Sequence, residues 1–259
     1  MKYLLIDAKA LIPKKYHFKV KQIYYRFRSL FYIGNRFICP CCNGHFRTFL
    51  QFGIKSRPNV LCPKCGSLER HRLLWLYLKH RTNLFSENLK VLHFAPEYIF
   101  QRTFKTMLNL DYISADLDSP IALVKIDITN ILYKDNMFDA ILCNHVLEHV
   151  LDDKKAMREL FRVLKPSGWA IIQVPIWTNR NETFEDQTIT SPEQRKRIFG
   201  QPDDVRMYGK DYKDRLEKAG FVVKVDDYVK ELDAKTIKKY CLMEDEDIYF
   251  CIKPNLKDD

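Results

Sequence analysis

The spacing of hydrophobic and polar positions changes near residue 89 of this 259-residue chain. From that point, apolar runs of strand length follow one another at residues 91–95, 112–116, 122–128, 138–144, 168–175, 221–228 and 247–253. Segments with apolar positions at helical spacing lie among them at residues 101–108, 153–164 and 212–219. Strands that alternate with helices predict a mostly parallel sheet with both faces covered. The last two strands have no clear helix between them, which favours a reversed final strand.

The first 88 residues follow a different plan. Residues 1–35 are basic, and their apolar positions recur at helical spacing, as in Tyr16, Val20, Ile23, Tyr24, Phe27, Leu30 and Phe31. We expect an amphipathic helix that packs on the main domain, in preference to one that lies on a membrane surface. Residues 36–67 hold a cysteine module, residues 68–88 a helix and linker, and residues 89–259 the α/β domain.

Five of the eight cysteines crowd into the short module. Cys39 and Cys42 form one CxxC pair, and Cys62 and Cys65 form a second pair after 19 intervening residues. Each pair can place two thiolates on one ion, and four thiolates complete the tetrahedral shell of a structural zinc ion (Zn2+). Cys41 lies between two of these ligands and could exchange with Cys42. A redox CxxC is the weaker interpretation, because no thioredoxin-like βαβ pattern surrounds either pair.

Composition and charge narrow the class of protein and partner. The longest apolar runs have only strand length and the N-terminus makes a poor signal peptide, so we expect a cytoplasmic protein without a membrane span. Residues 1–85 hold 17 Lys/Arg against Asp7 and Glu69, a net charge of +15, whereas the whole chain carries +10. This asymmetry predicts an anionic partner for the N-terminal third, and nucleic acid is one candidate.

Three blocks of sequence stand out after residue 89, namely YISADLD, KIDITNILYKDNMFDAILCNHVLEHVLDD and RVLKPSGWAIIQVP. Together they resemble class I S-adenosylmethionine (SAM)-dependent methyltransferases, close to the broad type 11 group. CPKCGSLERHR, VLHFAPE and FGQPDDVRMYG also resemble a subgroup that carries an N-terminal zinc ribbon. The resemblance implies a Rossmann-like α/β fold with a seven-stranded, mostly parallel sheet and an antiparallel last strand.

The same resemblance implies a SAM site. Asp116 ends the second strand, where the family's acidic residue binds the ribose hydroxyls, and Asp118 competes for this role two residues later. Asp127 stands where the family holds the adenine amino group, and Ile128 flanks the ring. Asn144 follows the fourth strand, at the edge where ligands of open α/β folds bind. For each aspartate, a role in capping a loop is the alternative.

The first motif departs from the family pattern. An acidic residue followed by GxGxG is usual, but this chain has His93-Phe94-Ala95-Pro96-Glu97. Ala95 is small enough to replace a glycine, whereas Pro96 removes an amide donor. We expect His93 or Glu97 to contact the methionine part of SAM instead. The departure also leaves open a non-catalytic binding module with a vestigial methyltransferase fold.

The candidate base and acceptor contacts lie farther along the chain. His145 also follows the fourth strand and could accept a proton from a hydroxyl nucleophile, with a structural histidine as the alternative. The long polar stretch between residues 175 and 212 predicts a lid, and Asp204, Arg206 and Tyr208 are its candidate substrate contacts. A solvated loop without a ligand is equally compatible with that stretch.

Two catalytic functions follow from these patterns. The polar lid favours methyl transfer to an O or N atom of a polar small molecule or glycan precursor. The basic N-terminal third favours methylation of rRNA or tRNA, with the zinc module binding the nucleic acid.

Overall fold

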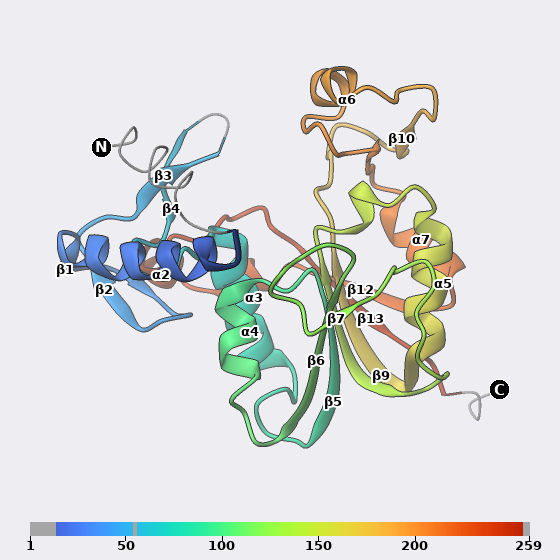
Figure 1. The fold of residues 1–259 in the computed structure, drawn as a ribbon, viewed down its shortest axis with the longest axis horizontal. Coiled ribbons are helices and arrows are strands. Elements are labelled where there is room, and N and C mark those ends of the chain that lie inside the picture. The colour runs from blue at the N-terminus through green and yellow to red at the C-terminus, as the bar shows by residue number, and fades with distance from the viewer. Residues whose placement is uncertain (1–13, 54–55, 256–259) are drawn as a thin grey trace. The chain divides into compact units, whose positions relative to one another are not determined.

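The computed structural model describes residues 14–53 and 56–255, which include two compact units. One unit consists of Met1–Thr82 with Tyr228–Glu246, and the other of Asn83–Asp227 with Asp247–Asp259 (Figure 1). The sequence predicted one continuous domain over residues 89–259, but residues 228–246 group with the first unit. Residues 1–13 of the predicted basic segment lie outside the described residues, as does the side chain of Tyr16.

The second unit is built on a seven-stranded sheet in the order β12-β13-β9-β8-β5-β6-β7. Adjacent strands from β9 through β8, β5 and β6 to β7 are parallel, whereas β13 runs antiparallel to both β9 and β12. The predicted mostly parallel sheet with an antiparallel last strand is therefore confirmed. The strands are β5 (Leu89–Phe94), β6 (Leu110–Asp116), β7 (Val124–Lys125), β8 (Phe138–Asn144), β9 (Leu164–Gln173), β12 (Val222–Asp226) and β13 (Ile248–Ile252).

Helices cover both faces of this sheet (Figure 1). Helices α5 (Asp153–Val163) and α7 (Tyr212–Lys218) pack on the face that carries Leu92 and Phe94. Helix α4 (Tyr98–Phe104) lies on the other face and packs its phenylalanines around His93. Burial on both faces explains why the central strands are apolar along most of their length.

The connections at one edge of the sheet form additional short elements. The 3-10 helix η1 (Leu147–His149) follows β8, and the predicted lid contains β10 (Phe184–Glu185), α6 (Pro192–Ile198) and β11 (Arg206–Met207). Strands β10 and β11 pair antiparallel. The backbone N–H of Val205 donates to the carbonyl of Glu148 at 2.9 Å, so the end of the lid is tied to η1.

The first unit surrounds the cysteine module with helices and two hairpins. Arg72 is fully buried there and donates to the carbonyls of Tyr240 at 2.6 Å, Val60 at 2.8 Å and Ser67 at 3.0 Å. These bonds attach residues 228–246 to the module. The elements are α2 (Lys14–Leu30), β1 (Ile33–Cys39), β2 (Gly44–Phe46), β3 (Leu50–Phe52), β4 (Arg57–Leu61), α3 (Glu69–Arg81), η2 (Tyr228–Glu231) and α8 (Ala234–Tyr240).

Several predicted boundaries are wrong. Helix α4 begins at Tyr98 and ends at Phe104, instead of spanning residues 101–108, because the chain turns directly after Pro96. The strand predicted at residues 122–128 is reduced to Val124–Lys125. Helix α8 lies between the last two strands, where no helix was expected. It buries none of its residues, which explains the missing apolar periodicity.

Helix α2 has the predicted helical structure. Its side chains Ile23, Phe27 and Leu30 are 54%, 66% and 61% exposed. Arg28 faces the cysteine module, where its guanidinium donates to the carbonyl of Pro63 at 3.1 Å. None of the helices between residues 14 and 255 is long and apolar enough to cross a membrane.

Candidate functional site

A cavity of about 510 Å³ opens where β5, β6 and β8 end. Because the three strands are parallel, their carboxyl ends meet at one edge of the sheet, where open α/β folds bind ligands. The lining includes five of the residues predicted to contact SAM or its acceptor, namely Ala95, Asp116, Asp127, Ile128 and His145. The tertiary structure thus brings together side chains that lie up to 50 positions apart in the sequence.

Asp116 is the last residue of β6 and is held in a fixed orientation. Its Oδ1 accepts hydrogen bonds from the backbone N–H groups of Asp118 at 2.8 Å and Ser119 at 2.6 Å. A carboxylate fixed through one oxygen can present the other to a vicinal diol. Asp118 does not line the cavity, and its side chain is 84% exposed with Lys125 at 3.6 Å. The geometry favours Asp116 over its competitor.

Asp127 and Ile128 line the same cavity beyond β7. Oδ1 of Asp127 accepts hydrogen bonds from the backbone N–H and the hydroxyl of Thr129, at 2.8 and 2.9 Å. This is the loop-capping arrangement considered as the alternative role. It leaves the second carboxylate oxygen for an amino group, so both roles are compatible with the structure. Ile128 is buried and supplies an apolar surface beside it.

Ala95 adopts the backbone conformation expected of a glycine. Its φ is +46°, in the left-handed region, and its backbone N–H donates to the carbonyl of Ala115 at 2.9 Å. For an alanine, that conformation costs about 1 kcal/mol. The first turn therefore retains a tight shape although the sequence lacks the usual glycines.

His93 does not line the cavity, and its contact with SAM stays a prediction. The ring is fully buried, with Nδ1 2.8 Å from the hydroxyl of Tyr112 and Nε2 2.8 Å from Oε2 of Glu97. Burial and the charge of Glu97 raise the pKa of Tyr112. His93 instead holds Glu97 in place. Successive side chains along β5 point to opposite faces of the sheet, so His93 faces α4, on the side opposite to Leu92 and Phe94.

Glu97 and Asn144 connect the first turn to the end of β8. The amide of Asn144 donates to Oε1 of Glu97 at 3.2 Å, and neither residue is in the cavity lining. Oδ1 of Asn144 is buried and has no hydrogen-bond partner among the described residues. An unpaired buried acceptor beside the cavity invites a donor such as an ammonium or amide group. Their predicted contacts with SAM stay predictions.

His145 has a partner that the sequence did not reveal. Its Nδ1 lies 3.2 Å from Oε1 of Glu148, whose side chain is only 4% exposed. A carboxylate that accepts the Nδ1–H proton leaves Nε2 as a proton acceptor. The φ of His145 is +54°, and its backbone N–H donates to the carbonyl of Gln173 at 2.7 Å. The turn after β8 thus directs this histidine into the cavity lining.

His149, one turn later, also lines the cavity. Burial lowers the pKa of His149, but the nearby carboxylates of Asp204, Glu148 and Asp203 outweigh it and raise the pKa to about 9. The LEHV sequence block gave no sign of these partners, because two of them come from the lid.

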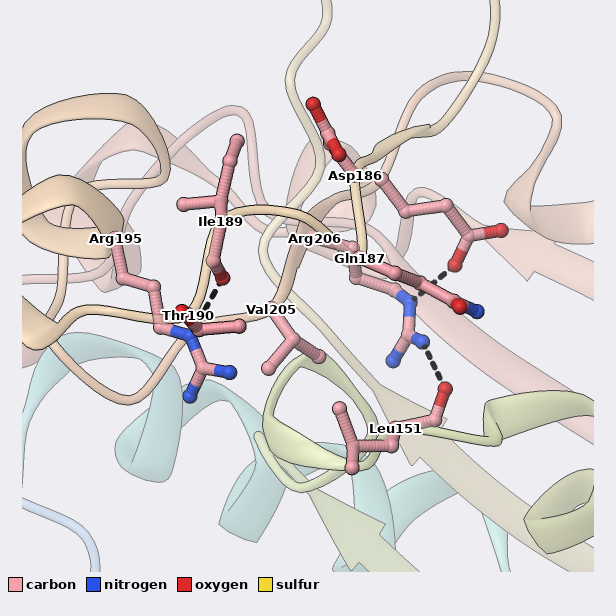
Figure 2. Close-up of a pocket in the computed structure, with 9 residues that line it drawn as sticks. Leu151, Asp186, Gln187, Ile189, Thr190, Arg195, Val205 and Arg206 are labelled. Atoms are coloured by element: carbon pink, nitrogen blue, oxygen red, sulfur yellow. Dashed lines mark hydrogen bonds and ion pairs between the residues drawn. The ribbon is translucent and has the colours of Figure 1, made fainter.

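A second cavity of about 350 Å³ lies in the lid (Figure 2). Leu151 lines both cavities, so the two are neighbours. The lining of the second cavity combines apolar side chains with both signs of charge. It consists of Leu151, Glu185, Asp186, Gln187, Ile189, Thr190, Arg195, Val205 and Arg206.

Arg206 lines this cavity, but other groups of the chain already occupy its guanidinium. It donates to the carbonyls of Leu147 at 2.6 Å and of Val150, and to Glu185 at 3.1 Å. Its bond to the carbonyl of Leu151, at 2.8 Å, is drawn in Figure 2. The side chain is 2% exposed. A guanidinium that is buried and satisfied in this way has little capacity left for a carboxylate or phosphate ligand.

Tyr208, the other predicted substrate contact, belongs to the core. It is fully buried, and its hydroxyl donates to Oδ2 of Asp153 at 2.7 Å. Burial and the Asp153 charge raise the pKa of Tyr208 well above its ordinary value. Polar sequence around these two residues indicated an exposed loop, whereas the fold uses their long side chains to attach the lid to η1 and α5.

The four predicted zinc ligands come together in the first unit. Their sulfur atoms all lie within 4.8 Å of one another, with 3.6 Å between Cys39 and Cys65 and 3.8 Å between Cys42 and Cys62. Cys41 is not in this cluster, and its sulfur lies 3.6 Å from the carbonyl of His71. The sulfur of Cys41 is therefore not among the four that could hold one ion.

The chemistry of the cluster fits a thiolate-binding ion. Burial raises the pKa of Cys39, but hydrogen bonds from the surrounding cysteines outweigh it and hold the pKa well below its ordinary value, whereas the hydrogen bond with Cys39 raises the pKa of Cys42. At Gly44, an added Cβ would lie 2.5 Å from the Phe46 ring and 3.3 Å from the Cys42 sulfur. The first knuckle therefore requires a glycine at position 44. Four sulfur atoms so close together match the donor set that zinc prefers.

Comparison with known proteins addresses the second unit. Residues 96–172 match a family model described as a methyltransferase domain. The demethylmenaquinone methyltransferase of Paenarthrobacter aurescens is 39% identical over 59 residues, which cover 20% of this chain and 23% of that protein. The ubiquinone/menaquinone biosynthesis C-methyltransferase UbiE of Cronobacter sakazakii is 29% identical over 80 residues, covering 30% and 28%.

The chain therefore spans less than a third of the length of these curated relatives. A solved S-adenosylmethionine-dependent methyltransferase from Mesorhizobium loti is 14% identical, with a TM-score of 0.45 over 69% of this chain and 95% of that one. The domain match supports a class I SAM-dependent methyltransferase. It begins after the cysteine module and so does not bear on the zinc site.

Proposed function

We propose that the second unit is a SAM-dependent methyltransferase and that the first unit carries a structural zinc ion. The observation that carries the first part is the cavity at the strand ends, with an oriented Asp116 and Asp127 inside the methyltransferase-domain match. SAM would bind along this edge, with its ribose hydroxyls on Asp116. The four sulfurs of the first unit would hold zinc in a closed shell, which suits a structural role.

The pair formed by His145 and Glu148 favours a hydroxyl acceptor. Methyl transfer from a sulfonium requires that the nucleophile, the methyl group and the sulfur atom be aligned and that water be excluded. SAM supplies the methyl group, and this chain supplies the alignment. Nε2 of His145 would accept the hydroxyl proton, and Glu148 would stabilise the resulting imidazolium across 3.2 Å.

The second cavity supports a polar small molecule or glycan precursor as acceptor. It adjoins the first cavity at Leu151. Its lining includes the carboxylates of Glu185 and Asp186 and the guanidinium of Arg195. An anionic acceptor loses support, because Arg206 is committed to carbonyl groups and Glu185. A neutral, hydroxyl-bearing molecule agrees better with this lining.

The relatives named above include a C-methyltransferase, so a carbon acceptor is a competing outcome. A carbon nucleophile in an electron-rich ring also needs a base, and His145 could serve it. Residues 96–172, which the family model matches, include Asp116, Asp127 and His145 and end before the lid. We keep oxygen as the preferred acceptor atom because charged side chains, Glu185, Asp186 and Arg195, stand among the apolar ones that line the lid cavity.

Methylation of RNA is the second candidate function, and helix α2 favours it. The exposed side chain of Phe27 lies on this helix with exposed Lys21 and Arg26, and exposed Phe31 follows directly after its end. Aromatic side chains stack on bases and basic ones bind phosphates, so this face has the composition of a nucleic-acid surface. Activity on RNA that disappears when residues 1–38 are deleted would establish this alternative.

The test uses SAM with a labelled methyl group and the full-length protein. Cell extract is separated into small molecules, RNA and lipids, and label transfer to each fraction is measured. We expect label in the polar small-molecule fraction, and a His145→Ala variant should lose it. Label in lipid would identify a quinone-type acceptor. If calorimetry detects no SAM binding at all, the vestigial binding module is the correct interpretation.

A further inference from the structure

Three metal-ligating side chains meet beside the SAM cavity, outside the roles assigned above. His149 belongs to η1, while Asp203 and Asp204 precede β11 in the lid. One donor atom from each lies within 4.8 Å of the other two. Nδ1 of His149 is 3.1 Å from Oδ1 of Asp204 and 3.7 Å from Oδ2 of Asp203.

These distances suit ligands of a single ion. Two ligands about 2.1 Å from one ion lie roughly 3.0–3.4 Å apart when the angle between them is between 90° and the tetrahedral value. The pair His149 and Asp204 is within this interval. Asp203 is slightly farther away, but its side chain is 68% exposed and can adjust by rotating.

The buried pair points to a ligand because it leaves polar atoms unsatisfied. The side chain of Asp204 is only 9% exposed, and its Oδ1 makes no hydrogen bond in the described chain. Nδ1 of His149 is likewise buried without a hydrogen bond, although the two atoms are close enough for an ion pair. The two atoms face each other at 3.1 Å without the geometry of a hydrogen bond, and a cation bound to both would satisfy them.

The scaffold around these side chains is firmly built. The backbone N–H of Val205 donates to the carbonyl of Glu148, immediately before His149. Arg206 donates to the carbonyls of Leu147 and Leu151, on either side of the histidine. These bonds fix the lid strand against η1 and hold the donor atoms at their spacing, as a preorganised cation site requires.

We propose that His149, Asp203 and Asp204 bind a divalent cation at the rim of the SAM cavity. One imidazole and two carboxylates suit Mn2+, Fe2+ or Zn2+. Three protein ligands leave coordination positions open. Because His149 lines the cavity, an open position can take an oxygen atom of the acceptor, which would lower the pKa of a hydroxyl there. This last role rests on the proposed methyl transfer, whereas the cation site does not.

The test measures Mn2+ binding to the full-length, zinc-replete protein by the loss of the free Mn2+ electron-paramagnetic-resonance signal. The cysteine cluster does not compete, because Mn2+ prefers oxygen and nitrogen ligands to thiolates. Wild-type protein should bind about one Mn2+ per chain. Asp204→Asn and the exposed variant Asp203→Asn should each weaken binding by about tenfold or more. Glu193→Gln, an exposed acid on α6, should bind as the wild type does.

Asp203→Asn keeps the test valid if Asp204→Asn does not fold, because an exposed side chain contributes little to stability. Absence of Mn2+ binding by the wild type would mean that the three side chains form an ion pair only, and would overturn the proposal. Equal binding by all variants would overturn it too. Calorimetry with SAM on the same samples tests the proposed enzyme separately, since SAM binding can fail while Mn2+ binding persists.

Discussion

Tyr208 and Asp153 form a buried hydrogen bond of 2.7 Å that joins the lid to the start of helix α5. Arg215 of α7 also contacts this carboxylate, at 2.8 and 3.0 Å. The lid is therefore attached to the core of the second unit by charged and polar side chains. A stretch of sequence with the composition of a solvated loop is thus a fixed part of the fold.

Because Arg206 attaches the lid to η1, we expect its substitution to lower the stability of the protein in the first place, with no direct loss of a ligand contact. Arg206→Ala should lower the free energy of unfolding by about 3 kcal/mol, because it leaves buried carbonyl groups and Glu185 without their donor. Urea denaturation followed by circular dichroism measures it. Arg195→Ala is the matched control, since the Arg195 side chain donates to the carbonyl of Ile189 alone among the described residues, at 3.2 Å. Equal stability of Arg206→Ala and wild type would contradict the structural role.

Removal of one predicted zinc ligand should abolish metal binding. We expect freshly purified protein to contain about one zinc ion per chain and Cys62→Ser to contain almost none, because three thiolates bind zinc more weakly than four. Cys41→Ser should retain the zinc, since its sulfur lies outside the cluster. Elemental analysis measures both variants. Loss of zinc from Cys41→Ser alone would reassign the ligand set.

The ribose assignment predicts that SAM affinity depends on Asp116. Asp116→Ala should weaken SAM binding by about 1.5–3 kcal/mol, the range for hydrogen bonds to a charged group. Isothermal calorimetry measures this, with Asp118→Ala as the control. If the control loses affinity and Asp116→Ala does not, the ribose lies on the neighbouring aspartate.

The conformation of Ala95 predicts that a β-branched residue cannot replace it. Ala95→Val should destabilise the second unit and weaken SAM binding, because valine is strained at a φ of +46°. Ala95→Gly should bind SAM at least as well as the wild type and gain up to about 1 kcal/mol of stability. Calorimetry and thermal unfolding give the two readouts. Normal SAM binding by the valine variant would show that this turn does not shape the cofactor site.

The pair of His145 and Glu148 predicts an effect on rate. The substrate for this test is the fraction of cell extract that accepts the labelled methyl group. Glu148→Gln should slow methyl transfer to it by about tenfold or more, and His145→Ala by about a hundredfold or more. SAM affinity should change little in either variant. A mild effect of His145→Ala on a small-molecule product would favour an amine acceptor, which needs less help from a base.

The class of fold and the residues of both candidate sites could be predicted from the sequence. Alternating strands and helices lead to a parallel sheet because each element must bury its apolar side against the other. The family blocks placed Asp116, Asp127 and His145 after strands, and parallel strands bring such positions to one edge. The paired CxxC spacing likewise selected four cysteines that meet in space, because each knuckle is a local structure.

The partners that these side chains contact from distant parts of the chain could not be predicted from the sequence. Arg206 and Tyr208 have the composition of surface contacts, yet carbonyl groups of η1 and the carboxylate of Asp153 bury them. His93 lies on β5 directly before the cavity residues Phe94 and Ala95, but the pleat turns it toward Tyr112. The grouping of His149 with Asp203 and Asp204, across more than 50 residues, likewise depends on where the lid returns. A local pattern records which residue types a segment contains, whereas their partners depend on packing between distant segments.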